Sequence, residues 1–372
     1  MINTIKFKNY KLFKKQQTLD IKPITVLIGK NSSGKSAVLK LPTLIENSLS
    51  GTFSEPLLLD NNGVELGGEF TDLVYGRLQG VIAFSLVNKS EKLDIDVALS
   101  SDNAPEILSW RLNEIDIDTS TVKFTGFLSQ STTIQTLSLH TNYISSRREG
   151  LKRYFEKQNK SYKTVGINGE YVYSILIEDG LSTTQQLINQ VSTFYQENFE
   201  GWGLRFNKDL VRPPYQFELE KNNLKINLKE VGLGMIHILP LVVSAFMPQE
   251  QETLTIIEEP ELHLHPAAHG NLAQLFVESL KDSNKRYLIE THSQNFVLRL
   301  RRLVAQGDLN KDNVVIYYVD FNEETDESRL IKINIDELGK PRNEAGEIYW
   351  PKNVFSETLD ETTAIRTAQL NK

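Results

Sequence analysis

The chain has 372 residues, of which 40% are hydrophobic and 24% charged, and its composition is that of an ordinary globular protein. Its formal net charge of −7 argues against a globally basic nucleic-acid-binding protein, although a local basic patch remains compatible with it. The absence of cysteine excludes disulfides and thiolate metal sites, and no apolar run approaches the roughly 20 residues of a membrane-spanning helix. Residues 1–6 lack the apolar core of a signal peptide, so we expect a cytoplasmic protein with no membrane partner.

The N-terminal part predicts strands that lead into a phosphate-binding loop. Residues 3–28 alternate apolar and polar positions, which indicates two or three strands, and the run 24–28 is apolar throughout, as in a strand buried on both faces. The following segment, Gly29-Lys30-Asn31-Ser32-Ser33-Gly34-Lys35-Ser36, fits the pattern G-x-x-x-x-G-K-[ST] of nucleotide hydrolases. A helix predicted at about 36–49 would aim its N-terminus at the phosphates.

Each residue type in this loop has a physical role. Its glycines allow backbone N–H groups to point at one centre, and Lys35 adds a mobile positive charge for the β- and γ-phosphates, which makes it a predicted catalytic residue. The Ser36 hydroxyl is a hard oxygen ligand suited to Mg²⁺. We therefore predict that ATP and Mg²⁺ bind at Gly29, Lys30, Asn31, Ser32, Ser33, Gly34, Lys35, Ser36 and Ala37.

The middle of the chain changes character twice. Short alternating runs at 81–87, 93–97, 115–117 and 122–124 predict an antiparallel β lobe. Helical spacing predicts a helix over 182–199, and residues 217–228 indicate a hairpin.

Between the β lobe and that helix lies a basic segment, residues 147–163. Its basic side chains are Arg147, Arg148, Lys152, Arg153, Lys157, Lys160 and Lys163. Two interpretations stay open: the segment contacts DNA phosphates without sequence preference, or one of its arginines serves the nucleotide site or a partner protein.

Two further apolar runs end in polar residues that suit nucleotide hydrolysis. The run 254–257 ends in Glu258 and Glu259, and a buried parallel strand delivers its C-terminal residues to the nucleotide crevice. We predict that Glu258 holds Mg²⁺, directly or through water, and that Glu259 orients or deprotonates the attacking water. The run 287–289 ends in Glu290-Thr291-His292-Ser293, where His292 is predicted to reach the γ-phosphate.

Together these motifs resemble the ABC-type ATPase heads of the SMC and RecF class, and more closely the bacterial AAA-family ATPases related to the OLD (overcoming lysogenisation defect) family. The resemblance covers most of the chain, at residues 5–10, 29–36, 143–149, 230–234, 258–266 and 291–293. Residues 346–355 are similar to a C-terminal W-P-x-x-F-F module of unknown function found on these ATPases. The implied fold is an α/β P-loop ATPase head with a mixed sheet, an antiparallel β lobe and an inserted helical subdomain.

This fold implies four segments along the chain. Residues 1–80 form the N-terminal part of the ATPase lobe with the phosphate loop, and residues 81–228 form the β lobe and the helical insertion. Residues 229–312 carry the signature loop, the Glu258–Glu259 strand end and His292, and residues 313–372 carry the last strands and the W-P module.

The resemblance also implies a head-to-head homodimer with ATP sandwiched between the phosphate loop of one subunit and the signature loop of the other. Gly232 and Gly234 would bind the phosphate there, although the loop lacks the serine that transporter-type heads carry. The glutamine expected between the two loops is not evident, and Asp72 and Gln79 are the candidates. A zinc site at His263-x-His265 is an alternative. The sequence contains neither a cysteine nor an H-E-x-x-H helix that would support it.

Three functions remain open at this point. The first is an ATP-hydrolysing switch that dimerises on ATP and controls DNA or an effector protein in trans, such as a nuclease or a toxin, in antiphage defence or DNA maintenance. The second is the ATPase subunit of a membrane transporter, which the signature loop does not favour. The third is a scaffold whose ATP site is nearly inactive. The 80 residues after His292 are too few for the Toprim domain that follows the head in OLD nucleases.

Overall fold

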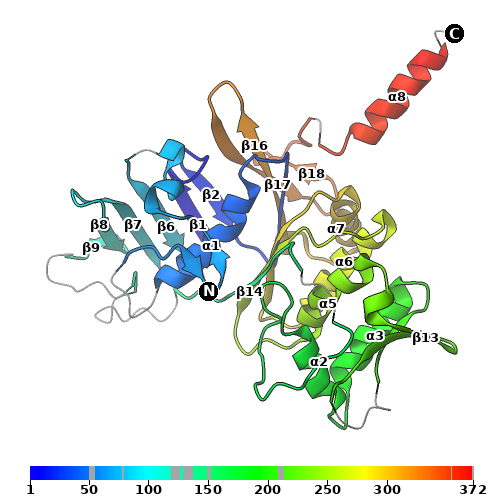
Figure 1. Ribbon diagram of the computed structural model, residues 1–372. Coiled ribbons are helices and arrows are strands. Elements are labelled where there is room, and N and C mark those ends of the chain that lie inside the picture. Colours follow the sequence, from blue (N-terminus) through cyan, green and yellow to red (C-terminus); the bar gives the residue numbers. More distant parts are fainter. Residues whose placement is uncertain are drawn as a thin grey trace.

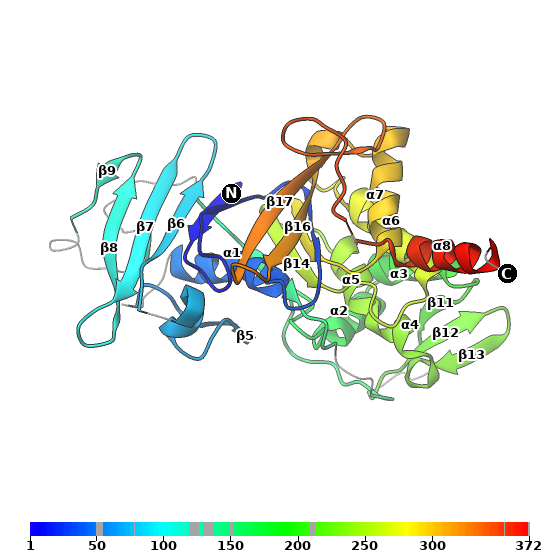
Figure 2. The same ribbon diagram turned by 90° about the horizontal axis from the view of Figure 1, so that it is seen from above.

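The computed structural model describes residues 1–49, 55–77, 79–118, 126–128, 137–148, 152–207, 213–352 and 354–370. A central mixed sheet separates an antiparallel sheet from a mainly helical part, and the three parts lie side by side in Figures 1 and 2. No helix among the described residues is long and apolar enough to cross a membrane.

The central sheet has seven strands in the order β10-β14-β15-β3-β16-β17-β18. The first five are parallel, and β17 and β18 add to one edge in antiparallel fashion. The strands are β3 (Ile24–Gly29), β10 (Thr141–Ile144), β14 (Thr253–Glu258), β15 (Lys285–Glu290), β16 (Val314–Asn322), β17 (Glu327–Ile335) and β18 (Pro341–Arg342).

Two hydrophobic cores lie on opposite faces of this sheet, and alternate residues of β3 contribute to each. Val26 and Ile28 belong to the core shared with the helical part, whereas Leu27 belongs to the core shared with the antiparallel sheet. Parallel strands covered on both faces are apolar at nearly every position, which explains the unbroken apolar runs of β3 and β14.

Helices cover both faces of the central sheet. On the side of the antiparallel sheet lies α1 (Lys35–Leu49), which begins at the phosphate loop. The helices that contribute to the other core are α2 (Val172–Gly180), α3 (Gln186–Asn198), α5 (Leu239–Phe246), α6 (Pro266–Ser279) and α7 (Gln294–Gln306). The short helix α4 (Leu233–His237) precedes α5.

The predicted antiparallel β lobe is confirmed as a six-stranded sheet in the order β2-β1-β6-β7-β8-β9. Its strands are β1 (Thr4–Lys8), β2 (Gln17–Asp20), β6 (Ile82–Val87), β7 (Lys92–Leu99), β8 (Pro105–Leu112) and β9 (Ile115–Asp116). The strand expected at 122–124 lies outside the described residues. Between β6 and the phosphate loop, β4 (Asp60–Asn61) and β5 (Val64–Glu65) form a two-stranded ribbon.

The helical insertion agrees with the sequence in both of its predicted elements. The helix expected over 182–199 is α3, and the expected hairpin is formed by β12 (Phe217–Lys221) and β13 (Leu224–Asn227). With β11 (Gly203–Phe206) these strands form a three-stranded sheet beside α3.

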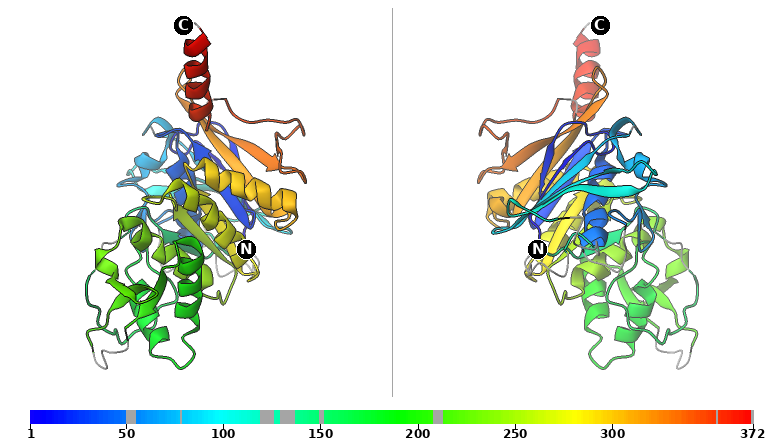
Figure 3. Two further views of the ribbon diagram at one scale, coloured as in Figure 1. Left: turned by 90° about the vertical axis from the view of Figure 1, so that its right-hand side faces the viewer. Right: turned by 90° about the vertical axis from the view of Figure 1, so that its left-hand side faces the viewer.

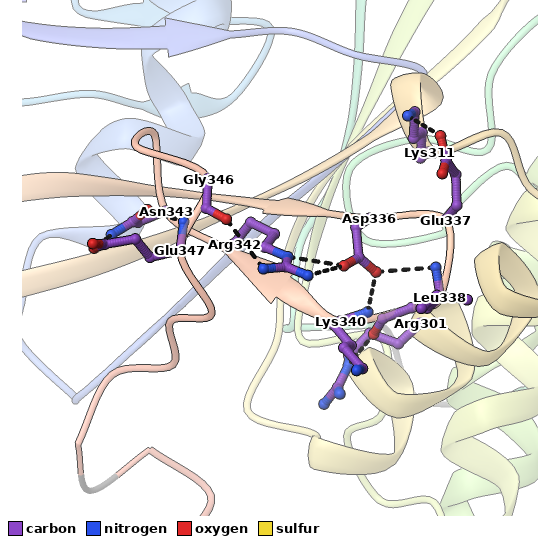
Figure 4. A network of polar contacts seen from close by, with 11 residues as sticks. Arg301, Lys311, Asp336, Glu337, Leu338, Lys340, Arg342, Asn343, Gly346 and Glu347 are labelled. Carbon is purple, nitrogen blue, oxygen red and sulfur yellow. Dashed lines mark hydrogen bonds and ion pairs between the residues drawn. The ribbon is translucent and has the colours of Figure 1, made fainter.

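The C-terminal segment is tied to the head by a polar network around Asp336 (Figure 4). The Asp336 carboxylate accepts hydrogen bonds from Arg342 and from the backbone N–H groups of Leu338 and Lys340. Arg301 of α7 donates to the carbonyl of Gly339 at 2.8 Å. Beyond this network, α8 (Glu357–Leu370) extends away from the body, as both views of Figure 3 show.

Candidate nucleotide site

The phosphate loop joins the end of β3 to the start of α1, as its flanking sequence predicts. Gly34 has φ +100°, and a Cβ there would lie 3.2 Å from the Phe13 ring, so the loop needs glycine at this position. Lys35 is only 4% exposed, and its Nζ donates to the carbonyls of Gly29 and Lys30 at 3.1 and 2.8 Å. The loop therefore wraps around the ammonium group that is expected to meet the phosphates.

A cavity of about 510 Å³ opens beside this loop. From the predicted site residues its lining includes Asn31, Ser32, Gly34, Lys35, Ser36, Ala37, Glu259 and His292. The rest of its lining consists of Tyr10, Lys11, Leu12, Lys40, Glu65, Leu66 and Glu290. Ser33 is not part of the lining, and its carbonyl accepts a hydrogen bond from the Ser328 hydroxyl of β17 at 2.7 Å. Three parallel strands thus bring loop, acid and histidine to one place.

Glu258 is the last residue of β14, and its carboxylate is held on the side of the edge strand β10. Its carboxylate accepts hydrogen bonds from the Tyr143 hydroxyl, from the Ser146 backbone N–H at 2.9 Å and from the Ser146 hydroxyl at 3.0 Å. Burial and the nearby Glu258 charge raise the pKa of Tyr143, so its hydroxyl stays a proton donor. Glu258 is not among the residues that line the cavity.

Glu290 is an acidic residue of the site to which the sequence assigns no role. It is 5% exposed, its Oε2 accepts a hydrogen bond from the Ser36 hydroxyl at 3.1 Å, and its Oε1 lies 3.7 Å from Lys35 Nζ. Burial raises the pKa of its carboxyl group, and the charge of Lys35 opposes that rise. The available signal was its position at the end of a third apolar run, equivalent to that of Glu258 on the neighbouring strand.

His292 follows directly and lies at the mouth of the cavity. Its backbone N–H donates to the buried Glu261 carboxylate at 2.6 Å. The next residue, Ser293, caps α7 by accepting from the Phe296 N–H at 3.1 Å. Partial burial and the charge of Lys35 lower the pKa of His292, so the ring is neutral at pH 7.

The contacts of Arg148 decide between the two interpretations of the basic segment for this residue. It is 6% exposed, and its guanidinium donates to the carbonyls of Glu258 at 2.8 Å, Glu259 at 3.1 Å and His237 at 3.3 Å. Burial lowers its pKa to about 10, which still leaves it charged at pH 7. The idea that Arg148 contacts DNA phosphates is therefore wrong, because protein carbonyls surround it.

The signature glycines lie in a different pocket of about 600 Å³, lined also by Trp202, His263 and His265. A Cβ on Gly234 would lie 2.4 Å from the His263 carbonyl oxygen, so only glycine allows this approach. Gly232 caps α4 in an extended conformation, and no described atom lies within 4 Å of a Cβ built there. The same chain therefore does not bring its signature loop to its own phosphate loop.

The remaining sequence candidates have local roles. The Asp72 carboxylate accepts from the Gly68 N–H at 2.9 Å and so caps its own turn, and Gln79 is exposed. His265 Nδ1 accepts from the Ala267 N–H at the start of α6, while the His263 ring packs edge-on against His237. Within the described part of the chain, no group of three or more histidine or acidic residues could hold a metal ion. The geometry thus gives the zinc alternative no support.

The comparisons with known proteins agree with this geometry. The family model described as AAA ATPase domain matches residues 1–104 and 102–297. An ATP/GTP phosphatase of Helicobacter pylori (strain ATCC 700392 / 26695) is 21% identical over 342 residues, which cover 83% of this chain and 90% of that protein. An OLD nuclease of Thermus scotoductus (strain ATCC 700910 / SA-01) is 24% identical over 358 residues, which cover 89% of this chain and 66% of the nuclease.

Solved structures show the same fold. An SMC head bound to the C-winged helix domain of ScpA has a TM-score of 0.53 at 12% identity, over 90% of this chain and 98% of the other. An SMC head with an extended coiled coil, bound to the C-terminal domain of ScpA derived from Pyrococcus furiosus, has a TM-score of 0.50 at 12% identity, over 90% and 96%. The expected α/β ATPase head with its mixed sheet is thereby confirmed. The chain belongs to the AAA ATPase domain family, and its fold is similar to that of SMC heads.

Proposed function

We propose that this protein binds ATP with Mg²⁺ and hydrolyses it as a molecular switch. The observation that carries this proposal is the convergence of Lys35, Ser36, Glu259 and His292 on one cavity of about 510 Å³. The donor set fits a magnesium triphosphate, because a buried ammonium group, a hydroxyl beside a carboxylate and a loop with glycine at positive φ surround it.

The residues divide the work of hydrolysis among them. Bound Mg²⁺ would neutralise charge on the phosphate oxygens. Lys35 and the loop N–H groups would orient the phosphates, Ser36 would hold the metal, and Glu258 would act on the metal directly or through water. Glu259 accepts the proton of the attacking water, and the neutral His292 donates a hydrogen bond to the γ-phosphate.

The proposal includes a homodimer with composite sites. Gly232 and Gly234 lie in a pocket separate from Lys35, which supports a site in which the signature loop of one subunit meets the phosphate loop of the other. ATP binding would close this dimer, and hydrolysis would open it.

The wider role is proposed from the relatives. The proposed role is control of DNA or of an effector protein such as a nuclease or a toxin, in cytoplasmic antiphage defence or DNA maintenance; a similar protein that is named a nuclease supports the nuclease part of it. The chain spans 66% of the length of the OLD nuclease, so that protein's whole activity is not carried over.

Glu259→Gln tests the enzymatic part of this proposal. The amide cannot accept a proton from water, so turnover should fall by about 100-fold or more, while ATP affinity stays within about threefold. The variant should also accumulate as an ATP-bound dimer, which light scattering detects. Glu278→Gln on the exposed face of α6 is the matched control and should turn over normally.

Lys35→Ala supplies the second arm of this experiment. It should lose binding of a labelled ATP analogue, because Lys35 is the lysine that the phosphate loop encloses. Wild-type turnover in Glu259→Gln would contradict the role of the base, and undiminished affinity in Lys35→Ala would contradict the site itself.

A further inference from the structure

We propose that Glu290 is the carboxylate that binds Mg²⁺ together with Ser36, and that it makes ATP binding dependent on that cation. This inference rests on the proposed ATP site and assigns its metal ligand to β15 rather than to β14. It concerns a residue that the sequence motifs do not single out.

Glu290 lies next to the phosphate loop and close to Ser36. The strand order β14-β15-β3 places β15 directly beside the strand that leads into the phosphate loop, and Glu290 pairs in register with Leu27. Its Oε2 lies 3.1 Å from the Ser36 hydroxyl, the expected hard ligand of the metal. Both residues line the cavity.

The competing carboxylate, Glu258, is already engaged by other residues. Glu258 accepts three hydrogen bonds from Tyr143 and Ser146 on the far side of its strand end. A direct metal bond by Glu258 would have to replace some of these contacts, whereas Glu290 would give up the hydrogen bond that it accepts from the Ser36 hydroxyl. Glu290 is therefore the carboxylate already directed at Ser36.

The charge of Glu290 also needs a cation once the nucleotide is bound. Glu290 is 5% exposed, and the nearest cation is Lys35 at 3.7 Å. Bound triphosphate would attract the Lys35 ammonium group and place several negative charges near a carboxylate that water scarcely reaches. A divalent cation between Ser36, Glu290 and the phosphates would offset the negative charge of Glu290 and that of the phosphates at once.

The ligand set also explains why the nucleotide is needed. In the described ranges of the chain, no three acidic or histidine side chains converge as a metal site. Mg²⁺ in proteins is commonly held by one or two carboxylates plus substrate phosphates, with water in the other positions. Ser36 and Glu290 therefore form half of a site that the phosphates complete.

The test measures the affinity of a fluorescent non-hydrolysable ATP analogue by anisotropy, in excess Mg²⁺ and in EDTA. For the wild type, Mg²⁺ should raise the affinity by about tenfold or more. In Glu290→Gln the rise should shrink to about threefold or less, through weaker binding with Mg²⁺ and stronger binding without it, because the amide removes both the ligand and the repulsion.

Glu258→Gln makes the same chemical change at the neighbouring strand end and should lose less of the rise than Glu290→Gln. Glu278→Gln, on the exposed face of α6, is the control and should keep the rise of the wild type. In a second measurement, electron paramagnetic resonance of Mn²⁺ with the ATP analogue should show about tenfold weaker metal binding in Glu290→Gln than in Glu258→Gln.

Each outcome decides the inference. The inference is wrong if Glu290→Gln keeps the wild-type rise. It is also wrong if the affinity of Glu290→Gln for the ATP analogue increases by the same factor with and without Mg²⁺, because Glu290 is then only a partner of Lys35. If Glu258→Gln alone loses the rise, the metal lies on Glu258. If the wild type binds no ATP analogue at all, the proposed function itself fails, which is a different result.

Folding of the variant can be checked independently. In Glu290→Gln the oxygen of the new amide can still accept from the Ser36 hydroxyl, so thermal unfolding without ligand should stay near that of the wild type. Should Glu290→Gln fail to fold, Glu290→Asp replaces it, because a side chain one methylene shorter retracts the carboxylate from Ser36. The Mg²⁺-dependent rise must then also shrink, and an unchanged rise overturns the inference.

Discussion

At the scale of single residues, Arg148 connects parts of the site that the sequence keeps far apart. Its guanidinium joins the carbonyls at the end of β14 to the carbonyl of His237 in α4. Glu259 has φ +39°, a backbone conformation that needs support from its surroundings in a non-glycine residue. Arg148 supplies that support and positions the carboxylate that is proposed to act as base.

Arg148→Met should therefore impair turnover more than binding. Methionine fills much of the space but leaves three carbonyls without their donor, so we expect the free energy of unfolding to fall by about 2 kcal/mol. Turnover should fall by about tenfold or more, with ATP affinity within about threefold of the wild type.

The exposed neighbour Arg147 offers the matched control, and Arg147→Met should leave both quantities unchanged. Arg148→Lys keeps the charge and should recover part of the turnover. A loss of affinity equal to the loss of turnover would contradict a positioning role, because it would mean that the variant damages the whole site.

At the scale of elements, α4 links the signature glycines to the nucleotide site of its own chain. It begins after Gly232 and ends at His237, which is 9% exposed and packs its ring against His263. Burial, His263 and Arg148 all lower the pKa of His237, in that order. The folded protein therefore holds this ring neutral under conditions in which an unfolded chain would begin to protonate it.

This difference predicts a pH dependence of stability. Below the ordinary pKa of 6.5, the unfolded state binds a proton that the folded state resists, so the free energy of unfolding should fall as pH falls through that window. His237→Gln removes the group, and its stability should depend less on pH between about 7.5 and about 5.5.

Urea unfolding at these two pH values measures the effect. His140→Gln, on the approach to β10, is the control and should keep the wild-type dependence. Identical pH dependence in the wild type and His237→Gln would show that the lowered pKa of His237 does not contribute to the stability.

At the scale of the whole molecule, the two halves of the predicted ATP site lie in two separate pockets. One holds the phosphate loop, and the other holds Gly232 with the exposed Leu233 beside it. A complete hydrolytic site would then need two chains. An experiment that mixes two variant chains can test this part of the proposed function.

Gly232→Asp is the suitable change, because the extended backbone and the open space at Gly232 accept a side chain, whereas Gly234 does not. The new carboxylate should oppose the partner's γ-phosphate and abolish turnover. Mixed with Lys35→Ala chains, it should recover part of the ATPase activity, because one composite site in each mixed dimer remains intact.

Gly232→Asn is the neutral control of equal size and should retain more activity than Gly232→Asp. If no mixing ratio restores any turnover, then composite sites are absent or both must act together. Steady-state phosphate release across mixing ratios measures the recovery.

The sequence by itself determined the phosphate loop, the apolar parallel strands and the acidic or histidine residues at their ends. These features depend on local chemistry. The loop conformation requires glycine at fixed positions, and a strand covered on both faces must be apolar along its length. The same reasoning located α3 and the β12–β13 hairpin, because their periodicity lies within each segment.

Only the tertiary structure decided which carboxylate faces Ser36 and what surrounds Arg148. The order β14-β15-β3 puts Glu290 next to the phosphate-loop strand, and the edge strand β10 brings Tyr143 and Ser146 to Glu258. Arg148 follows that edge strand, which turns it into the interior rather than toward solvent. Strand order joins residues more than a hundred positions apart, and no local pattern in the chain encodes such neighbours, because they arise when the strands pair and the two cores close around them.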